Sequence, residues 1–308
     1  MKLIHYCTAF LFSGLLFSWP AIAAEYKVVA RAHQGIDYAR EQWQPTIDYL
    51  NNKIPQHKFI LYPLVSLAEI TERVGKKEFD FILTNPSSYV EISELYGAKV
   101  IATLNNKRAD TAQSRFGSVI FTHVRNEDII SIRDLKNKRL IAVSESAFGG
   151  WRVAWLEMLK ENFDPYTDLK ALLFAKGKTQ PEVVEAVFNG SADAGVVRTD
   201  LLERMEESGK IDLRYFRVLA HKDVDGFPFF LSTDLYPEWA FSASESVPED
   251  LSIKVQNVLF SISPESAPAN KGKYVGWLPP SDYSRVKELL EKLNIVPFTD
   301  KYVRRNTQ

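Results

Sequence analysis

The stretch RLIAVSESAFGGWRVAWLEML, residues 139–159, decides the fold because it joins two different periodicities. Its first residues are apolar and β-prone, which is typical of a buried strand. Its last ten residues carry apolar side chains at helical spacing, at Trp151, Ala154, Trp155, Met158 and Leu159. The stretch therefore predicts a strand, a turn over residues 144–150 and a helix. Because the first backbone N–H groups of a helix have no partner within it, such a turn can hold an anion.

Serine and glycine at a strand-to-helix turn are also ordinary capping residues, and this turn alone leaves both interpretations open. If the turn binds a ligand, the contacting residues are Ser144, Ser146, Phe148, Gly149 and Gly150. Further turns of the same design elsewhere in the chain favour ligand binding.

A second such turn follows the apolar residues 79–83, which predict a buried strand. Pro86 suits the first position of the helix that follows, and the neighbouring serines can cap that helix or offer hydroxyl groups to a ligand. The candidate ligand residues of this turn are Asn85, Ser87, Ser88 and Tyr89.

A third turn contains Arg198, which follows the predicted strand 192–197 and precedes the predicted helix 201–208. Ligands of open α/β sheets bind at the carboxyl ends of strands, and a guanidinium offers several donors to an oxyanion. The alternative is an ion pair between Arg198 and either Asp200 or Glu203. Both interpretations stand at this point.

Two further candidates are His33 and Thr179, which follow the predicted strands 26–30 and 172–175. Thr179 opens a helix over residues 180–188, where plain capping is the alternative to ligand contact. The triplet Gly177-Lys178-Thr179 does not form a P-loop, because Leu172 stands where that motif needs glycine.

The remaining pattern alternates strands with helices and predicts an α/β fold with two lobes. Helix 36–52 should kink or restart at Pro45, residues 105–114 read as a polar loop, and residues 116–124 as a strand that crosses between lobes. We predict lobe 1 over residues 25–118 and 230–308 and lobe 2 over residues 119–229. Each lobe should be a mixed sheet flanked by helices.

The first 24 residues are typical of a cleavable signal peptide, with Lys2, an apolar block and small residues up to Ala24. Cleavage is expected after Ala23 or Ala24; an uncleaved anchor is the alternative. The single cysteine, Cys7, lies inside this segment, so the exported chain has no disulfide. We expect export to the periplasm and no insertion into the membrane thereafter.

Composition excludes several functions. A formal charge of −1 gives no basic field for nucleic acid. Four histidines lie outside the signal peptide, His33, His57, His123 and His221, and none has the spacing of a metal site. We therefore expect no metal, no cofactor and no enzymatic activity. The competing hypothesis is a secreted hydrolase that uses His33 with Ser144 or Ser146.

These residues resemble the type II periplasmic solute-binding proteins of the phosphonate-binding group, through residues 79–89 and the Ser144 turn. The chain is more similar still to the periplasmic sensor region of tetrathionate-type sensor histidine kinases. That likeness is carried by Gln42-Trp43-Gln44-Pro45, Leu83-Thr84-Asn85-Pro86, Phe148-Gly149-Gly150, Val197-Arg198-Thr199 and Leu235-Tyr236-Pro237-Glu238-Trp239.

The resemblance implies a monomeric receptor that closes around a small anion and presents it to an ABC permease or to a sensor histidine kinase. It implies that the ligand is held by the turns at Asn85–Tyr89 and Ser144–Gly150. Phosphonate receptors typically carry an acidic residue where this chain has Arg198. We therefore expect a phosphonate, sulfur oxyanion or organic dianion rather than an aminophosphonate. Since the sequence ends at Gln308 without a kinase, the partner should be a separate protein.

Overall fold

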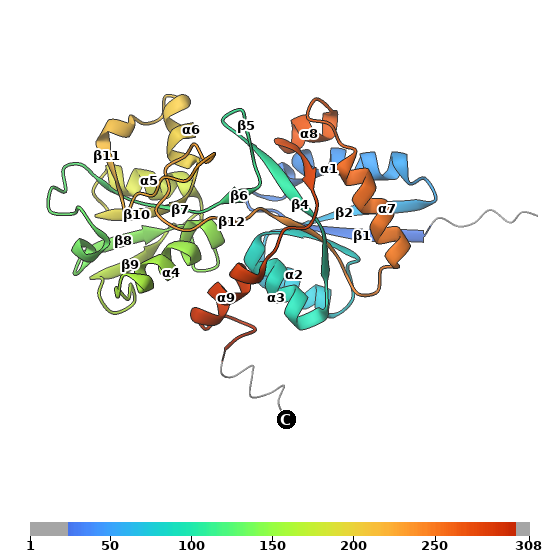
Figure 1. Ribbon diagram of the computed structural model, residues 1–308, viewed down its shortest axis with the longest axis horizontal. Coiled ribbons are helices and arrows are strands. Elements are labelled where there is room, and N and C mark those ends of the chain that lie inside the picture. The colour runs from blue at the N-terminus through green and yellow to red at the C-terminus, as the bar shows by residue number, and fades with distance from the viewer. Residues whose placement is uncertain (1–23, 300–308) are drawn as a thin grey trace, which may run out of the picture.

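Alternating strands and helices build two sheets from residues 24–299, the part of the chain that the computed structural model describes (Figure 1). The first sheet has seven strands in the order β14-β4-β13-β3-β1-β2, with β5 beside β4. Its strands are β1 (Ala24–Arg31), β2 (His57–Leu64), β3 (Phe81–Thr84), β4 (Lys99–Arg108), β5 (Thr111–Gln113), β13 (Ala240–Ala243) and β14 (Tyr274–Leu278). β1 runs parallel to β2 and β3, whereas β13 runs antiparallel between β3 and β4.

Helices cover both faces of this first sheet (Figure 1). They are α1 (Ile36–Lys53), α2 (Leu67–Gly75), α3 (Pro86–Tyr96), α7 (Glu249–Phe260), α8 (Ala267–Gly272) and α9 (Ser284–Lys292). Strand β1 shows why both faces are apolar. Val28 and Ala30 pack in one core with Trp43 of α1, while Val29 packs in another with Ile70 of α2. Successive side chains of a strand point to opposite faces, so an unbroken apolar run requires helices on both.

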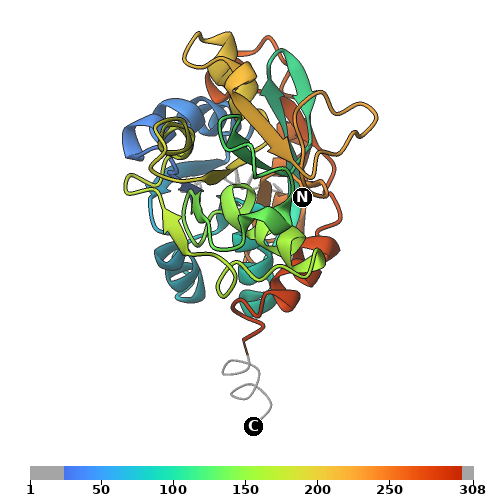
Figure 2. The same cartoon turned by 90° about the vertical axis from the view of Figure 1, so that its left-hand side faces the viewer.

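The second sheet has five strands in the order β11-β7-β10-β8-β9. They are β7 (Ser118–His123), β8 (Arg139–Ala142), β9 (Ala171–Phe174), β10 (Ala194–Arg198) and β11 (Phe216–Leu219). The helices are α4 (Val153–Lys160), α5 (Gln180–Phe188) and α6 (Leu201–Glu207), with 3₁₀ turns at Ile132–Leu135 and Leu213–Tyr215. In Figure 2 this second lobe stands in front of the first.

Two chain segments join the lobes and pair with each other as β6 (Arg115–Phe116) and β12 (Tyr236–Pro237). Beyond this short antiparallel ladder, Ser118 N–H donates to Thr233 Oγ1 at 3.0 Å and Ile120 N–H donates to Ser232 Oγ at 2.9 Å. The outgoing and returning segments are therefore tied side by side (Figure 1). The residue limits given above for lobe 1 (25–118 and 230–308) and lobe 2 (119–229) remain a prediction.

Two details differ from the sequence-based expectation. Residues 105–114, expected as a polar loop, form the end of β4 and its hairpin partner β5, because backbone pairing with β14 and β5 supports polar residues there as well as apolar ones. Helix α1 continues through Pro45 without a second helix starting there. Packing of Trp43 and Ile47 against the sheet offsets the backbone hydrogen bond that proline removes.

The predicted signal peptide lies outside the described residues except for Ala24, which begins β1. Within residues 24–299, no helix has both the length and the apolar character that crossing a membrane requires.

Candidate functional site

Three arginines and one histidine from both lobes form what we call the basic cluster: Arg31, His33, Arg108 and Arg198. Arg31 ends β1, Arg108 ends β4, and Arg198 ends β10 of the second lobe. The positive charges of all three arginines lower the pKa of His33, which places the four side chains in one neighbourhood. The cluster thus lies where strands from separate sheets end, the edge at which α/β proteins bind ligands.

Two buried carboxylates hold the basic cluster together. Glu238 is fully buried, and its Oε1 accepts hydrogen bonds from Arg198 Nη2 and, at 2.9 Å, from Asn106 Nδ2. Asp200 lies 3.7 Å from Arg198 Nε and 3.6 Å from Arg108 Nε. Since Arg108 extends from the first sheet and Asp200 follows β10 of the second, this contact spans the two lobes.

The open question about Arg198 is answered in part by these contacts. Arg198 does pair with Asp200, while the carboxylate of Glu203 accepts instead from the backbone N–H of Phe230. The guanidinium of Arg198 also lies over the ring of Phe116, 4.0 Å from its centroid. Arg198 is therefore held in one orientation before any ligand arrives.

The cluster nevertheless keeps an excess of positive charge, because its three guanidiniums face two carboxylates and Asp200 is shared with Arg204. Nη1 of Arg31, Nε of Arg108 and Nε of Arg198 are all buried without a hydrogen-bond partner. Burial lowers the pKa of Arg31 and that of Arg108. The two Nε atoms lie 3.6 and 3.7 Å from the carboxylate of Asp200, too far for a hydrogen bond. Buried donors without a hydrogen bond cost free energy, and an oxyanion would satisfy them.

His33 sits among these charges with its ring edge-on to Trp239 and Tyr38, at centroid distances of 5.3 and 6.1 Å. Desolvation, followed by the charges of Arg108, Arg31 and Arg198, lowers the pKa of His33 to about 4. As a whole residue His33 is exposed, so the basic cluster is open to solvent on this side. At neutral pH it is an uncharged imidazole within a positive site.

A pH dependence of stability follows. In the unfolded chain His33 takes up its proton near pH 6.5, but in the folded protein only near pH 4. Above pH 6.5 neither state binds this proton, and the free energy of unfolding is unaffected. As the pH falls from 6.5 toward 4, the unfolded chain takes up the proton first, so the free energy of unfolding decreases. We expect the melting temperature of the wild type to fall more steeply over this range than that of His33→Gln. His221→Gln, outside the cluster, should follow the wild type; equal slopes for all three proteins would contradict the assignment.

The Asn85 turn provides a hydroxyl pair next to another arginine. Asn85 Oδ1 accepts from the N–H of Ser88 at 3.0 Å and from Ser87 Oγ at 3.1 Å, which makes Asn85 the helix cap. Ser87 Oγ in turn accepts from Arg152 Nη1 at 3.0 Å, across the gap between the lobes. Ser88 Oγ is buried and has no partner. One hydroxyl of this turn thus remains available to a ligand.

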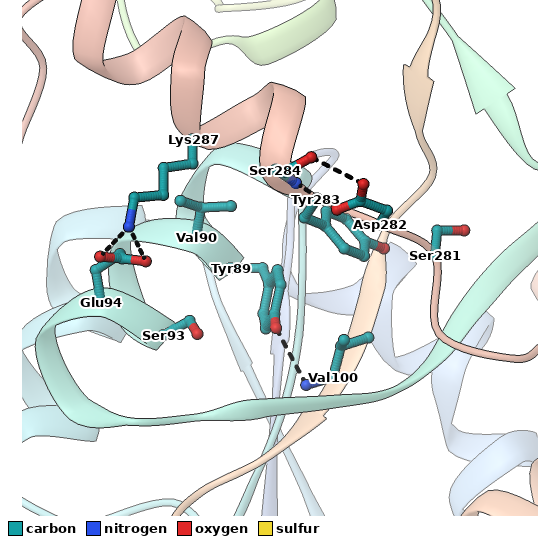
Figure 3. A pocket seen from close by; sticks show the side chains of 10 residues that line it. All are labelled: Tyr89, Val90, Ser93, Glu94, Val100, Ser281, Asp282, Tyr283, Ser284 and Lys287. Carbon is teal, nitrogen blue, oxygen red and sulfur yellow. Dashed lines mark hydrogen bonds and ion pairs between the residues drawn. The ribbon is translucent and has the colours of Figure 1, made fainter.

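Tyr89, the last candidate of that turn, points into a different pocket, which lies between α3 and α9 (Figure 3). Its hydroxyl accepts from the N–H of Val100 at 3.2 Å, and its ring packs edge-on against Tyr283. Glu94 and Lys287 at the same pocket pair with each other at 2.9 Å. With a volume of about 230 Å³ and its polar groups engaged in this way, this pocket is the weaker candidate for a ligand site.

The Ser144 turn divides into an open and a buried half. Ser144 is partly exposed and Ser146 exposed, whereas Phe148, Gly149 and Gly150 are buried. The buried half begins a π-helix, Phe148–Arg152, in place of the first turn expected for α4. A Cβ at Gly149 would lie 2.7 Å from a ring carbon of Phe116 and 3.2 Å from Arg198 Cγ, so this glycine lets the turn touch the cluster.

Thr179 stands at the N-cap position of α5 without a capping hydrogen bond, and its hydroxyl donates instead to Glu182 Oε1 at 2.7 Å. The neighbouring Gln180 reaches the cluster instead, where its Oε1 accepts from the backbone N–H of Arg198 at 2.7 Å. His33 hydrogen-bonds to Gln34, and no hydrogen bond links it to Ser144 or Ser146. The hydrolase hypothesis requires contact between His33 as the base and Ser144 or Ser146 as the nucleophile, and neither serine is hydrogen-bonded to His33.

Four residues of the site were not among those predicted from the sequence: Arg31, Arg108, Arg152 and Glu238. The sequence does contain a signal for Arg31, which ends an apolar strand as Arg198 does. Arg108 and Glu238 carry no such signal, because their partners are distant in the sequence: Arg108 meets Asp200, and Glu238 meets Arg198.

Two α/β lobes, joined by two crossing segments and enclosing a basic cluster at strand ends, define the class of type II periplasmic binding proteins. A family model described as "ABC transporter, phosphonate, periplasmic substrate-binding protein" matches residues 34–300, and the chain belongs to that family.

Individual relatives agree with this family. The chain is 29% identical over 278 residues to the tetrathionate sensor histidine kinase TtrS of Salmonella typhimurium, covering 90% of this chain but only 45% of that protein. The solved structure of PhnD1 from Prochlorococcus marinus with methylphosphonate superimposes with a TM-score of 0.68 at 14% identity, over 88% of this chain and 99% of that one. A Xanthomonas citri protein bound to ATP gives a TM-score of 0.68 at 14% identity, over 87% and 96% of the chains.

Proposed function

We propose that the protein captures a small, doubly charged oxyanion at the basic cluster between its lobes. The supporting observation is that Arg31, Arg108 and Arg198, drawn from both lobes, each keep a buried nitrogen without a hydrogen-bond partner. Ser87 and Ser88 and the Ser144–Gly150 turn are included in the proposed site as flanking hydroxyl and amide donors. The role is binding without catalysis.

The ligand class follows from the charge of the site. Glu238 and Asp200 neutralise part of the cluster, so an aminoalkyl cation has no carboxylate left to meet, and the surplus guanidinium donors favour an anion with several oxygens. Tetrathionate and methylphosphonate, named for two relatives, both belong to this class. A sulfur oxyanion suits three converging guanidiniums best, since its charge does not depend on pH near neutrality.

We propose that the protein works in the periplasm as a monomer, after loss of a signal peptide that ends at Ala23 or Ala24. Two membrane partners follow from its relatives: an ABC permease from the family, and a sensor histidine kinase from the relative of which this chain spans 45%. Loss of oxyanion uptake on deletion of the gene would favour the permease. Unchanged uptake with loss of an oxyanion-dependent transcriptional response would favour the kinase.

Calorimetric titration with tetrathionate, thiosulfate and methylphosphonate tests the proposed ligand class. A ligand present at ~100 times its dissociation constant should stabilise the fold by about 2.7 kcal/mol. Arg31→Gln should weaken binding of the preferred anion about tenfold to a hundredfold, because it removes hydrogen bonds to a charged group worth about 1.5–3 kcal/mol.

The matched control is Arg214→Gln, since Arg214 is exposed and its ion pair within residues 24–299 is with Asp212, at the 3₁₀ turn before β11. It should bind as the wild type does. If Arg31→Gln and Arg214→Gln bind alike, or if no anion of the panel binds, the basic cluster is not the ligand site.

A further inference from the structure

A second pocket, of about 560 Å³, is lined in part by Ser144 and Ser146 of the turn that flanks the proposed oxyanion site, but by none of the four residues of the basic cluster. One side comes from the carboxyl ends of the adjacent parallel strands β8 and β9, through residues 144–146 and through Phe174, Ala175 and Lys178. Residues 293–295, which follow α9 of the first lobe, close the other side. Organic ligands occupy pockets of roughly 300–1,000 Å³, whereas one inorganic oxyanion would leave most of this volume empty.

Five of the eleven residues that line this pocket are apolar, and two of these five are aromatic. Trp155 and Phe174 line it from the second lobe, and Leu293 and Ile295 from the first. The ring of Trp155 is fixed by Trp151, stacked at 6.0 Å, and by Tyr166, edge-on at 4.9 Å. Trp155 Nε1 is buried without a partner. The pocket therefore has one rigid, flat aromatic wall.

The charged groups of the pocket are two cations and one carboxylate: Arg152, Lys178 and Glu145. Arg152 is held in place by donating to Ser87 Oγ at 3.0 Å and to the Glu145 carbonyl at 3.3 Å. Lys178 forms no ion pair within residues 24–299. The pocket thus has a fixed guanidinium and a free ammonium beside an apolar wall.

We propose that this pocket binds a second class of ligand, an organic anion with a flat apolar body and one acidic head group such as a sulfonate. The head group pairs with Arg152 and Lys178, because a guanidinium fork matches a planar or tetrahedral oxyanion. The apolar body lies between Trp155 and the segment 293–295, since aromatic rings contribute large contact areas. Because both lobes line the pocket, occupancy stabilises their closed arrangement.

Calorimetry with benzenesulfonate on the full exported chain tests this proposal. Benzenesulfonate should bind about tenfold or more tightly than methanesulfonate, which has the same head group without the ring, and benzyl alcohol should not bind measurably. Arg152→Gln should weaken benzenesulfonate binding about tenfold or more. Lys178→Gln, at an exposed position that leaves folding intact, should weaken it about threefold to tenfold.

The matched control is Lys176→Gln, an exposed lysine two residues earlier that does not line the pocket and should leave binding unchanged. Equal effects of Lys176→Gln and Lys178→Gln, or equal affinities for the two sulfonates, would overturn the proposal. So would displacement of benzenesulfonate by tetrathionate, since that requires one shared site. Absence of any tetrathionate binding contradicts the proposed oxyanion function alone, because the benzenesulfonate titrations are read independently of it.

Discussion

Replacing Glu238 with leucine is expected to lower the free energy of unfolding by about 3–5 kcal/mol, the range observed when one partner of a buried ion pair is removed. Glu238 is fully buried, and its carboxylate accepts from Arg198 Nη2, from Asn106 Nδ2 and from the N–H of Trp239. Leucine fills the space but leaves all three donors unsatisfied. Urea denaturation followed by circular dichroism measures the loss.

The control for Glu238→Leu is Glu72→Leu, which removes an exposed ion pair with Lys76. Exposed pairs contribute about 0–1 kcal/mol, so this variant should remain close to the wild type. A loss for Glu238→Leu no larger than that for Glu72→Leu would show that Glu238 does not balance the charge of Arg198.

We expect Glu238→Leu to strengthen ligand binding although it lowers the stability of the fold. Without Glu238, three guanidiniums face Asp200 alone, so the site becomes more positive. Tetrathionate should therefore raise the melting temperature of Glu238→Leu by more than that of the wild type. A smaller rise would mean that Glu238 is needed to position Arg198 rather than to balance its charge.

The strand-to-helix turns could be predicted from the sequence, because each depends on the spacing of residues that are close together in the chain. The change of apolar period around Ser144–Gly150, Pro86 at a first helical position and Arg198 at a strand end need no knowledge of distant residues. The structure agrees with the element order at each of these turns. Local sequence patterns were sufficient to predict where a strand ends and the next helix begins.

The basic cluster could not be assembled in the same way. Arg108 lies in a polar hairpin, and Glu238 lies in the returning segment more than a hundred residues later. Their contact with Arg198 and Asp200 depends on the crossing of β6 and β12, which no periodicity encodes. The net charge of a site shared by two lobes depends on the topology. The spacing of residues within one lobe does not predict which charged residues of the other lobe lie nearby.

Gly117 lies at that crossing, and its replacement by valine is expected to destabilise the protein by about 3 kcal/mol or more. A Cβ there would lie 2.6 Å from Leu231 Cδ1, 2.7 Å from Thr233 Oγ1 and 2.8 Å from the backbone oxygen of Asp234. The side-chain atoms can shift, but the Asp234 oxygen belongs to the returning segment that pairs with the outgoing one. Denaturation measures the loss, and Gly117→Ala should fall between valine and the wild type.

Gly75→Ala supplies the comparison, because the three atoms nearest to a Cβ at Gly75, the last residue of α2, belong to the far end of the Tyr96 side chain and not to the backbone. Alanine is also favoured over glycine in a helix by about 1 kcal/mol, so this variant should be within about 1 kcal/mol of the wild type. If Gly117→Val is tolerated as well as Gly75→Ala, the two crossing segments must separate easily. The lobes would then not depend on close contact at Gly117, and the cluster they share would have to be held by Arg198, Asp200 and Glu238 alone.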